Sequence, residues 1–409
     1  MIFYRYFILI IILLSQVACD VSPNTSSAES GNNNVLPYVN PMIATGGHGH
    51  AFPGAVVPFG MVQLSPDNIS KGWDWTSGYH YSDNQLIGFS HTHLSGTGVG
   101  DLLDVLVMPF HGDYLNFKNT SIGRPIATYD HSNEYASPGY YHVRLNETNI
   151  EAELTASARV GVHRYSFTKK DDAQLLFDLG YAQNFDKSVV SYLRVVDDKT
   201  LVGYRLSTGW ARNQPLYFIA RFDKPFTYQL YDNGTPIEGN LVQTQKGEIV
   251  LHFGDLQGQP LTSSVALSYV SIDGAKKNLE KEVPKLNFDV VKQQAQDAWQ
   301  SQLGRFTIKD DNEEAKIKFY TALYHSYLAP QLFSDVDGHY FGADGAVHQN
   351  TQLPRYTLFS LWDTFRALHP LLTITDPSRV NAITESLLGF YDENGFLPHS
   401  WSYHQVITA

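Results

Sequence analysis

The chain has 409 residues, of which 43% are hydrophobic and 17% are charged. This length exceeds what one compact core usually holds, so we expect two domains after an N-terminal extension. The formal net charge is −12, and lysine and arginine residues form no cluster. This distribution argues against a nucleic-acid-binding protein, because that class needs a concentrated basic surface.

The N-terminus predicts export. Arg5 precedes the apolar run Phe7–Leu14, which is shorter than the ~20 residues that span a bilayer, so residues 1–18 resemble a signal peptide. Cys19 is the only cysteine, and its position resembles that of the lipidated cysteine in bacterial lipoproteins. We therefore expect a protein of the bacterial periplasm or cell surface, anchored by a lipid on Cys19. The alternative is an ordinary signal peptide with an incidental cysteine.

Residues 19–36 are rich in serine, asparagine and glycine without apolar periodicity, which predicts a flexible tether. Between residues 37 and 280, short apolar or alternating runs are separated by turn-forming residues. Many short strands at this spacing favour an antiparallel β-sandwich over a parallel α/β sheet. The clearest strand-like runs are Tyr140–Leu145, Glu153–Phe167, Gln174–Leu179, Leu216–Phe222 and Val265–Ile272.

The pattern then becomes helical. Apolar residues recur at helical spacing, and Asp310–Asn312 offers a cap for one of the helices. Strands followed by helices indicate a multidomain α+β chain. We expect a β-domain over residues 37–280, a helical linker over 281–305 and a helical domain over 306–409. The predicted helices are Phe288–Leu303, Asn312–Leu328, Ser360–Leu372 and Pro377–Tyr391.

Two glycine- or aromatic-rich clusters lie in the N-terminal part. Gly46–His50 holds two histidines that could bind a metal, but further ligands are not identifiable, so a structural loop is favoured. In the second cluster Trp73 adjoins Asp74, and His91 and His93 follow. An indole face stacks on a sugar ring and a carboxylate accepts from its hydroxyls, so this cluster suits sugar binding. From the local pattern alone, a buried aromatic patch is the favoured interpretation.

A third cluster again places tryptophan beside aspartate, at Trp362 and Asp363. Arg366 follows three residues after Asp363, and the two could simply pair with each other on a helix. Asp335–Gly338 hints at a calcium loop, but Ala346 stands where an EF-hand needs glutamate, so a turn is favoured.

Together these clusters resemble the opening of the family 92 glycoside hydrolases. Further stretches agree with that family in order and spacing, and the similarity covers about residues 37–398. The stretches that carry it are Asn40–His50, Pro58–Asp67, Gly72–Tyr81, Leu154–Ala156, His163–Tyr165, Phe319–His325 and Ser360–Pro370.

The resemblance implies a β-sandwich followed by an (α/α)6 barrel. It also implies an exo-acting, calcium-dependent, inverting α-mannosidase that acts on mannose-bearing glycans. Inversion needs an acid for the leaving oxygen and a carboxylate base for water, ~6.5–9.5 Å apart. The family's active site lies between the two domains, so the clusters above are expected to contact substrate. The expected substrate-binding residues are Trp73, Asp74, His91, His93, Trp362, Asp363 and Arg366; for the two histidines, packing at the domain junction is the alternative.

The family's acid and base motifs do not occur in this sequence. The Leu-Pro-x-Trp turn that normally leads towards them begins at Leu397 and then loses the pattern. We therefore expect the N-terminal half of such an enzyme with a truncated barrel, no catalytic residue and most calcium ligands elsewhere, and hence an inactive chain on its own. The rival hypothesis is a non-catalytic glycan-binding surface lipoprotein. Metal-dependent hydrolysis through His48, His50, His91 and His93 is disfavoured.

Overall fold

The computed structural model describes residues 34–168 and 172–398, and the described residues from Val35 onward belong to one compact unit. The predicted signal peptide, Cys19 and nearly all of the predicted tether lie outside the described residues, as does the end of the expected barrel domain. Among the helices that the structure describes, none is both long and apolar enough to cross a bilayer.

The first of two large antiparallel sheets contains several strands that are buried along their whole length. Its nine strands are β1 (Ala55–Val56), β2 (Gln63–Asn68), β3 (Gln85–Ser90), β4 (Leu106–Phe110), β5 (Ala127–Thr128), β10 (Gln174–Asp178), β14 (Thr227–Asp232), β15 (Thr235–Ile237) and β17 (Gly247–His252). Their order is β1-β2-β3-β4-β10-β17-β14-β15, with β5 paired to β3. Every residue of β2, β4 and β10 is buried, so both faces of this part of the sheet are covered.

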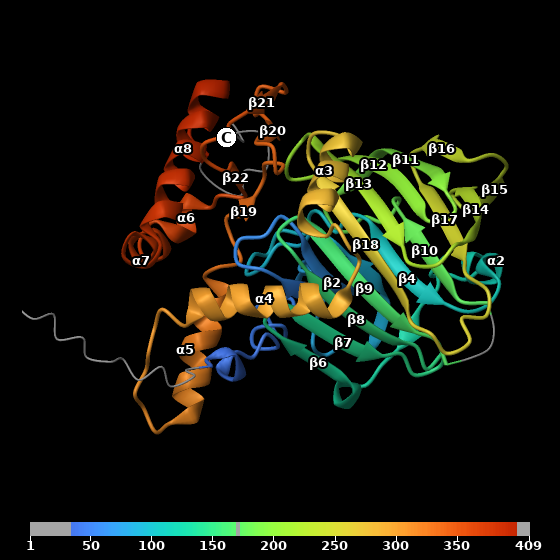
Figure 1. The fold of residues 1–409 in the computed structure, drawn as a ribbon, viewed down its shortest axis with the longest axis horizontal. Coiled ribbons are helices and arrows are strands. Elements are labelled where there is room, and N and C mark those ends of the chain that lie inside the picture. Colours follow the sequence, from blue (N-terminus) through green and yellow to red (C-terminus); the bar gives the residue numbers. More distant parts are fainter. Residues whose placement is uncertain (1–33, 169–171, 399–409) are drawn as a thin grey trace, which may run out of the picture. The chain divides into compact units, whose positions relative to one another are not determined.

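The second antiparallel sheet also has nine strands. They are β6 (Glu134–Ser137), β7 (Tyr140–Arg144), β8 (Glu151–Ala156), β9 (Val160–Ser166), β11 (Lys187–Asp197), β12 (Thr200–Thr208), β13 (Gln214–Phe222), β16 (Leu241–Thr244) and β18 (Leu261–Ser268). The order is β16-β11-β12-β13-β18-β9-β8-β7-β6. The long hairpin β11–β12 lies beside β16 at one end of the order (Figure 1).

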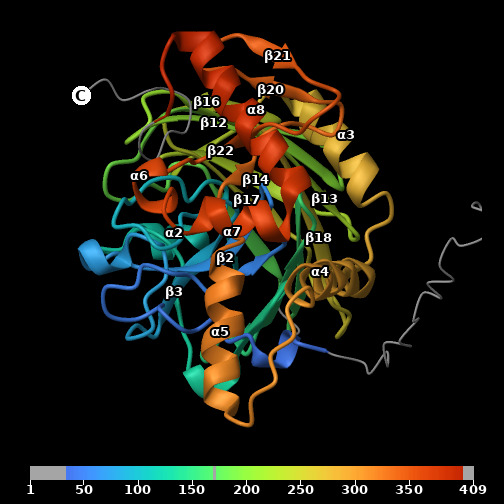
Figure 2. The same cartoon turned by 90° about the vertical axis from the view of Figure 1, so that its left-hand side faces the viewer.

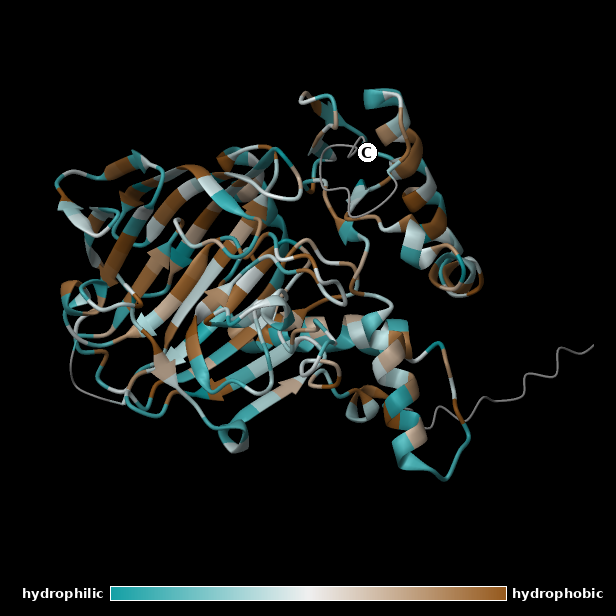
Figure 3. Ribbon diagram, turned by 180° about the vertical axis from the view of Figure 1, so that it is seen from behind, coloured by the Kyte–Doolittle hydropathy of each residue, from teal (hydrophilic) through white to brown (hydrophobic). Residues whose placement is uncertain are grey.

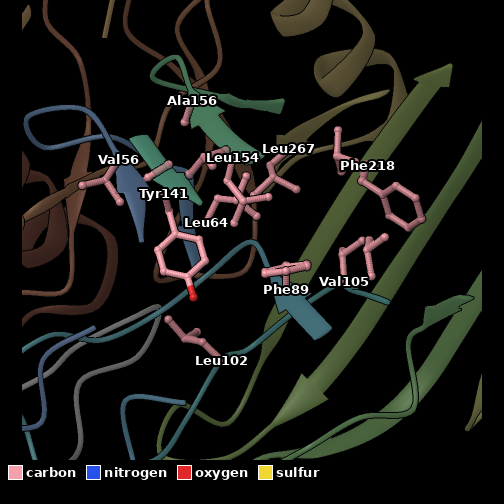
Figure 4. Packing of buried hydrophobic residues seen from close by; sticks show 14 of the residues in the cluster. Val56, Leu64, Phe89, Leu102, Val105, Tyr141, Leu154, Ala156, Phe218 and Leu267 are labelled. Atoms are coloured by element: carbon pink, nitrogen blue, oxygen red, sulfur yellow. The ribbon is translucent and has the colours of Figure 1, made fainter. Parts of the chain in front are cut away.

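Side chains of both sheets meet in one hydrophobic core (Figure 4). Phe89 of β3 lies 6.4 Å, ring centre to ring centre, from Tyr141 of β7. Phe177 of β10 stacks on Phe218 of β13 at 6.3 Å. Apolar residues line the strands of both sheets, shown brown in Figure 3. The prediction of an antiparallel, strand-rich N-terminal region is confirmed.

Individual strands differ from the expected runs in two places. The run Glu153–Phe167 is two strands, β8 and β9, because Ser157 N donates to Val160 O (2.9 Å) and closes a turn between them. The run Val265–Ile272 ends as a strand at Ser268. Ser271 then caps a helix that the sequence pattern did not reveal, α3 (Ile272–Glu282), which packs on β18 and β13.

The predicted helix Phe288–Leu303 is confirmed as α4 with the same bounds. The Asn287 side chain caps it by accepting from Val290 N (3.2 Å). Trp299 is fully buried and its Nε1 donates to the carbonyl of Val56 in β1 (2.7 Å). This bond fastens α4 to the first sheet.

The next predicted helix is α5 (Glu313–His325), with Asn312 as the expected cap, accepting from Ala315 N (3.1 Å). It ends three residues earlier than predicted, since Tyr327 turns to pack on Phe59 at 5.5 Å. Two small two-stranded antiparallel sheets follow. They are β19 (Gln331–Leu332) with β22 (Tyr356–Thr357), and β20 (His339–Phe341) with β21 (Val347–Gln349).

The C-terminal described segment is helical. The expected helix Ser360–Leu372 is two helices, α6 (Leu361–Thr364) and α7 (Leu368–Thr375), because Ala367 leaves helical geometry at φ −126° and ψ −53°. The helix α8 (Pro377–Asn394) starts at the predicted proline and ends at Gly395 with φ +82°. It packs against α7 and β22 (Figure 2). Asp335–Gly338 is the turn that was expected, closed by Gly338 N donating to Asp335 O (2.9 Å). Short helices at other positions are η1 (Leu36–Tyr38), η2 (Trp73–Trp75), α2 (Tyr114–Lys118) and η3 (His131–Asn133).

Candidate functional site

A pocket of about 240 Å³ lies between the loop that follows β3 and the segments at the end of α5 and around α6. Much of its lining is apolar and comes from Ala329, Pro330, Leu358, Phe359 and Leu368. One side comes from the β-rich region and the other from the helical region. Its polar lining comprises hydroxyls, two imidazoles and a single carboxylate. The residues with polar side chains are Ser95, His325, Ser326, Ser360, Asp363, Thr364 and His369.

Asp363 supplies the carboxylate. The Ser360 hydroxyl donates to its Oδ2, and its backbone N donates to Ser360 O (3.0 Å), so the first turn of α6 orients the side chain. Asp363 is exposed at the pocket while Ser360 is buried. A carboxylate held this way keeps free lone pairs that accept from hydroxyl groups of a ligand.

The two imidazoles of the pocket are neutral at pH 7. Burial lowers the pKa of His325 to about 4 and also lowers the pKa of His369. His369 Nε2 lies 3.0 Å from the Thr364 hydroxyl, while the buried His325 Nε2 has no hydrogen-bond partner among the described residues. A neutral imidazole offers one donor and one acceptor, which matches a hydroxyl. The sequence analysis missed both residues, although each lies within a family-like stretch, Phe319–His325 or Ser360–Pro370.

Trp73 lies beside this pocket. Its side chain is 57% exposed, and its Nε1 donates to the carbonyl of Gly98 (3.0 Å). Its indole packs edge-on against the His50 ring at 4.2 Å. The backbone carbonyl of His50 in turn accepts from Gly96 N (2.8 Å), and Gly96 lines the pocket. Trp73 therefore contacts two residues, His50 and Gly98, that lie next to the pocket residue Gly96 through a hydrogen bond or in the chain.

Asp74 points to His48 rather than into the pocket lining. Its Oδ1 lies 2.5 Å from His48 Nδ1, and this hydrogen bond lowers the pKa of Asp74. The neighbouring His50 Nδ1 lies 2.7 Å from the Thr76 hydroxyl. Across residues 34–168 and 172–398, no three His, Cys, Asp or Glu side chains gather as metal ligands would. The structural reading of the Gly46–His50 loop fits these contacts.

Both His91 and His93 are fully buried, which favours the packing alternative for these two residues. Their contact with a ligand stays a prediction. His93 Nδ1 donates to the carbonyl of Gln63 (2.6 Å), and its Nε2 lies 3.0 Å from Asp67 Oδ1. His91 Nδ1 donates to the carbonyl of Val105 (2.8 Å). The nitrogens of both rings have hydrogen-bond partners within the protein, and neither ring reaches the surface.

His91 belongs to a chain of buried hydrogen bonds whose direction is fixed. Because its Nδ1 donates to Val105, its Nε2 accepts from His163 Nε2 (2.9 Å), and His163 Nδ1 accepts from the Tyr165 hydroxyl (2.8 Å). Burial lowers the pKa of His91 to about 3 and holds the pKa of His163 well below its usual range. The chain is neutral, and it ties β9 to the loop between β3 and β4.

That loop is strained where it returns to β4. Leu102, Leu103 and Val105 have φ values of 71°, 63° and 55°, a region that branched and bulky side chains avoid. Asp104 holds the loop in place. Its carboxylate accepts from Arg205 Nη1 (2.5 Å) and from the Thr92 hydroxyl (2.8 Å). Arg205 is fully buried and also bonds Asp186 and two backbone carbonyls.

The remaining predicted residues lie at the helical side. Trp362 is 70% exposed, and the Arg366 guanidinium lies over the Phe365 ring, 5.3 Å from its centre. Of the expected substrate-binding residues, Asp363 is the one in the pocket lining, and Trp73 adjoins it. Ligand contact by Trp73, Asp74, Trp362, Asp363 and Arg366 stays a prediction.

Similarity to solved structures covers nearly the whole chain. A family 92 α-mannosidase from Bacteroides thetaiotaomicron, also solved with mannoimidazole, is 34% identical, with a TM-score of 0.87, over 92% of this chain and 52% of that chain in its first structure. A family 92 inverting mannosidase from the same organism is 28% identical, with a TM-score of 0.80, over 91% of this chain and 50% of its own. An uncharacterised secreted glycosidase from Arthroderma benhamiae is 27% identical over 332 residues, 73% of this chain and 42% of that protein.

The chain thus spans about half the length of these relatives. Two family models match in sequence. Residues 38–268 match the glycosyl hydrolase family 92 N-terminal domain, and residues 274–408 match the glycosyl hydrolase family 92 catalytic domain. On these matches, the chain belongs to glycosyl hydrolase family 92.

Proposed function

We propose that this chain forms the sugar-binding half of an exported α-mannosidase, with the terminal mannose of a glycan held in the pocket at Asp363. The observation that carries this proposal is the pocket itself. Its hydroxyls, neutral imidazoles and one carboxylate are groups that recognise sugar hydroxyls, and Trp73 offers an exposed ring beside it. The related mannosidase solved with mannoimidazole supports mannose as the sugar.

Hydrolysis needs more than this pocket provides. An inverting glycosidase uses two carboxyl groups ~6.5–9.5 Å apart, whereas the described lining holds Asp363 alone. We propose that Asp363 orients the sugar and that the acid and base lie outside these 409 residues. The two packed sheets then form the family's β-sandwich, and α5 to α8 contribute the first part of an (α/α)6 barrel.

We propose a calcium requirement for the complete enzyme only. Calcium takes six to eight oxygen ligands, usually including several carboxylates. The residues that the structure describes do not fit the ion by themselves, since no cluster of three candidate ligands exists among them and the pocket holds one carboxylate. No step of sugar binding proposed here depends on it.

Export and lipid anchoring at Cys19 remain part of the proposal. The N-terminal pattern supports export, and the fungal relative is a secreted glycosidase. The test is membrane fractionation of the full chain expressed in bacteria. Wild-type protein should sediment with membranes and Cys19→Ser should become soluble in the periplasm. Equal fractionation of both would contradict the lipid anchor.

A non-catalytic glycan-binding lipoprotein is the second candidate, favoured by the single carboxylate and the exposed aromatic rings. Incubation of the purified chain with α-1,2-mannobiose and calcium tests whether this chain hydrolyses the substrate on its own. Both forms of the proposal predict bound sugar without released mannose. Release of mannose above the buffer rate would show that the 409 residues contain a complete acid–base pair.

The role of Asp363 is tested by calorimetric titration with mannose. Asp363→Asn removes a charged acceptor, and hydrogen bonds to charged groups contribute about 1.5–3 kcal/mol, so affinity should fall by about tenfold or more. Asp392→Asn, an exposed aspartate on α8, is the matched control and should bind like wild type. Unchanged affinity in Asp363→Asn would show that the sugar does not bind at Asp363.

A further inference from the structure

Two exposed aromatic rings lie outside the pocket and outside the motifs considered so far. Phe185 is 56% exposed and Trp210 is 36% exposed. Their ring centres are 6.0 Å apart at 61°, an edge-to-face contact. Lys187 of β11 pairs with Thr208 of β12, so each aromatic stands two residues beyond the last paired residue of this hairpin. We call Phe185 and Trp210 the outer aromatic pair.

Backbone N–H groups of the outer aromatic pair donate hydrogen bonds to the same loop that accepts a hydrogen bond from the Trp73 side chain. Phe185 N donates to Gly100 O (3.2 Å), and Trp210 N donates to Asp101 Oδ2 (3.1 Å). Trp73 Nε1 bonds the carbonyl of Gly98. The loop positions Gly98 and Asp101 are three residues apart and so at most about 11 Å from each other. Trp73, Phe185 and Trp210 therefore all bond to one short segment, Gly98–Asp101, which follows the pocket residue Gly96 in the chain.

The backbone around these residues is closely packed. A Cβ on Gly98 would come within 2.5 Å of the Trp73 indole, and one on Gly209 within 2.1 Å of Asp101 Oδ1. Asp101 is buried and also accepts from Gln214 Nε2 (2.7 Å). The loop itself is anchored by the buried Arg205. Rings fixed before binding lose less conformational entropy when a ligand stacks on them.

The surroundings of the pair are polar. Asn184 adjoins Phe185, and Arg212 and Asn213 follow Trp210; all three are exposed. Flat apolar faces bordered by amide and guanidinium groups match a sugar, which combines an apolar ring face with hydroxyls that donate and accept. A purely apolar partner would leave those polar groups desolvated without hydrogen bonds, which is costly.

We propose that the outer aromatic pair is a second sugar-binding site, which stacks on residues of an oligosaccharide beyond the one held in the pocket. This rests on the proposed function, because the oligosaccharide is taken to run from Asp363 past Trp73. The pair then makes the chain prefer extended glycans over mannose itself.

The test compares calorimetric affinities for mannose and for a linear α-1,2-linked mannotetraose. Wild type should bind the tetraose about tenfold tighter than mannose, since aromatic contacts contribute about 0.5–1.5 kcal/mol each. Phe185→Ser with Trp210→Ser should remove most of that gain and leave mannose affinity unchanged. The conservative pair Phe185→Tyr with Trp210→Phe should retain it. Tyr135→Ser, a 57% exposed ring elsewhere, is the control and should keep the gain.

The outcomes separate this inference from the proposed function. If mannose binds at Asp363 but the serine variant keeps the full gain for tetraose, the outer pair is not a sugar site and the inference fails alone. If mannose does not bind but tetraose binds through Phe185 and Trp210, the proposed function fails and the second site stands. Loss of both affinities in the serine variant would also overturn the inference, because the pair would then act on the loop instead of on the outer sugars.

Discussion

Replacement of Arg205 by methionine tests the buried support of the pocket loop. Arg205 lies fully buried in β12 and bonds the carboxylates of Asp104 and Asp186 and the carbonyls of Leu179 and Tyr181. Methionine fills similar volume but leaves two carboxylates buried without their cation. Removing one partner of a buried ion pair costs about 3–5 kcal/mol, so we expect a loss of that size in the free energy of unfolding at pH 8.

The loss should depend on pH with a definite sign. Two buried carboxylates without a cation are relieved when they bind protons, and the unfolded chain binds those protons only at lower pH. The destabilisation of Arg205→Met should therefore be smaller at pH 5 than at pH 8.

The assay is urea unfolding of wild type and variants, followed by tryptophan fluorescence at both pH values. Arg221→Met is the matched control. Arg221 lies in the neighbouring strand β13, and its Nη2 is 3.6 Å from Glu280 Oε1. The side chains of Arg221 and Glu280 are 38% and 53% exposed. Exposed pairs contribute at most about 1 kcal/mol, so little change is expected. A loss below about 1 kcal/mol for Arg205→Met, or the same loss at both pH values, would refute the reasoning.

Two further predictions concern stability. Burial raises the pKa of Asp335 to about 6, so its proton stabilises the fold below the ordinary value of 3.8 and that stabilisation is lost as pH rises through 6. Unfolding titrations should thus show the stability of wild type relative to that of Asp335→Asn falling from pH 4 to pH 7.5; the same difference at both pH values would contradict the assignment. Trp299→Phe leaves the buried Val56 carbonyl without its donor and opens a cavity, so urea unfolding should show a loss of about 2 kcal/mol or more. Trp362→Phe, at an exposed position, should lose little, and comparable losses in the two variants would count against the α4–β1 bond.

The sequence predicted the helices best where a cap stands before a periodic run. Asn287 and Asn312 cap the starts of α4 and α5, and the cap at Asn312 falls within the predicted Asp310–Asn312. The break at Ala367 was not predicted because residues 360–372 keep an apolar pattern that also suits one continuous helix. The helix α3 was missed since its N-cap, Ser271, follows the strand β18 after only two residues.

For the site, the sequence could indicate which residue types gather but not which of them reach the surface. His91 and His93 belong to the same aromatic-rich cluster as the exposed Trp73, yet they are buried because their partners Val105, Gln63 and Asp67 come from other strands and loops. His325 lines the pocket because it lies at the end of α5. No local sequence pattern distinguishes it from a histidine that only packs against its neighbours. The outer aromatic pair depends on the β11–β12 register, which sequence spacing alone does not fix.

The location of the bound sugar is the most direct test of the proposed half-site. Hydrogen exchange of the purified chain with and without saturating mannose reports it segment by segment. Backbone amides of the loop around Ser95–Gly98 and of residues 360–369 should exchange more slowly with mannose present, while those of β14–β15 should not change. Protection confined to other segments, or no protection at all, would contradict a mannose pocket at Asp363.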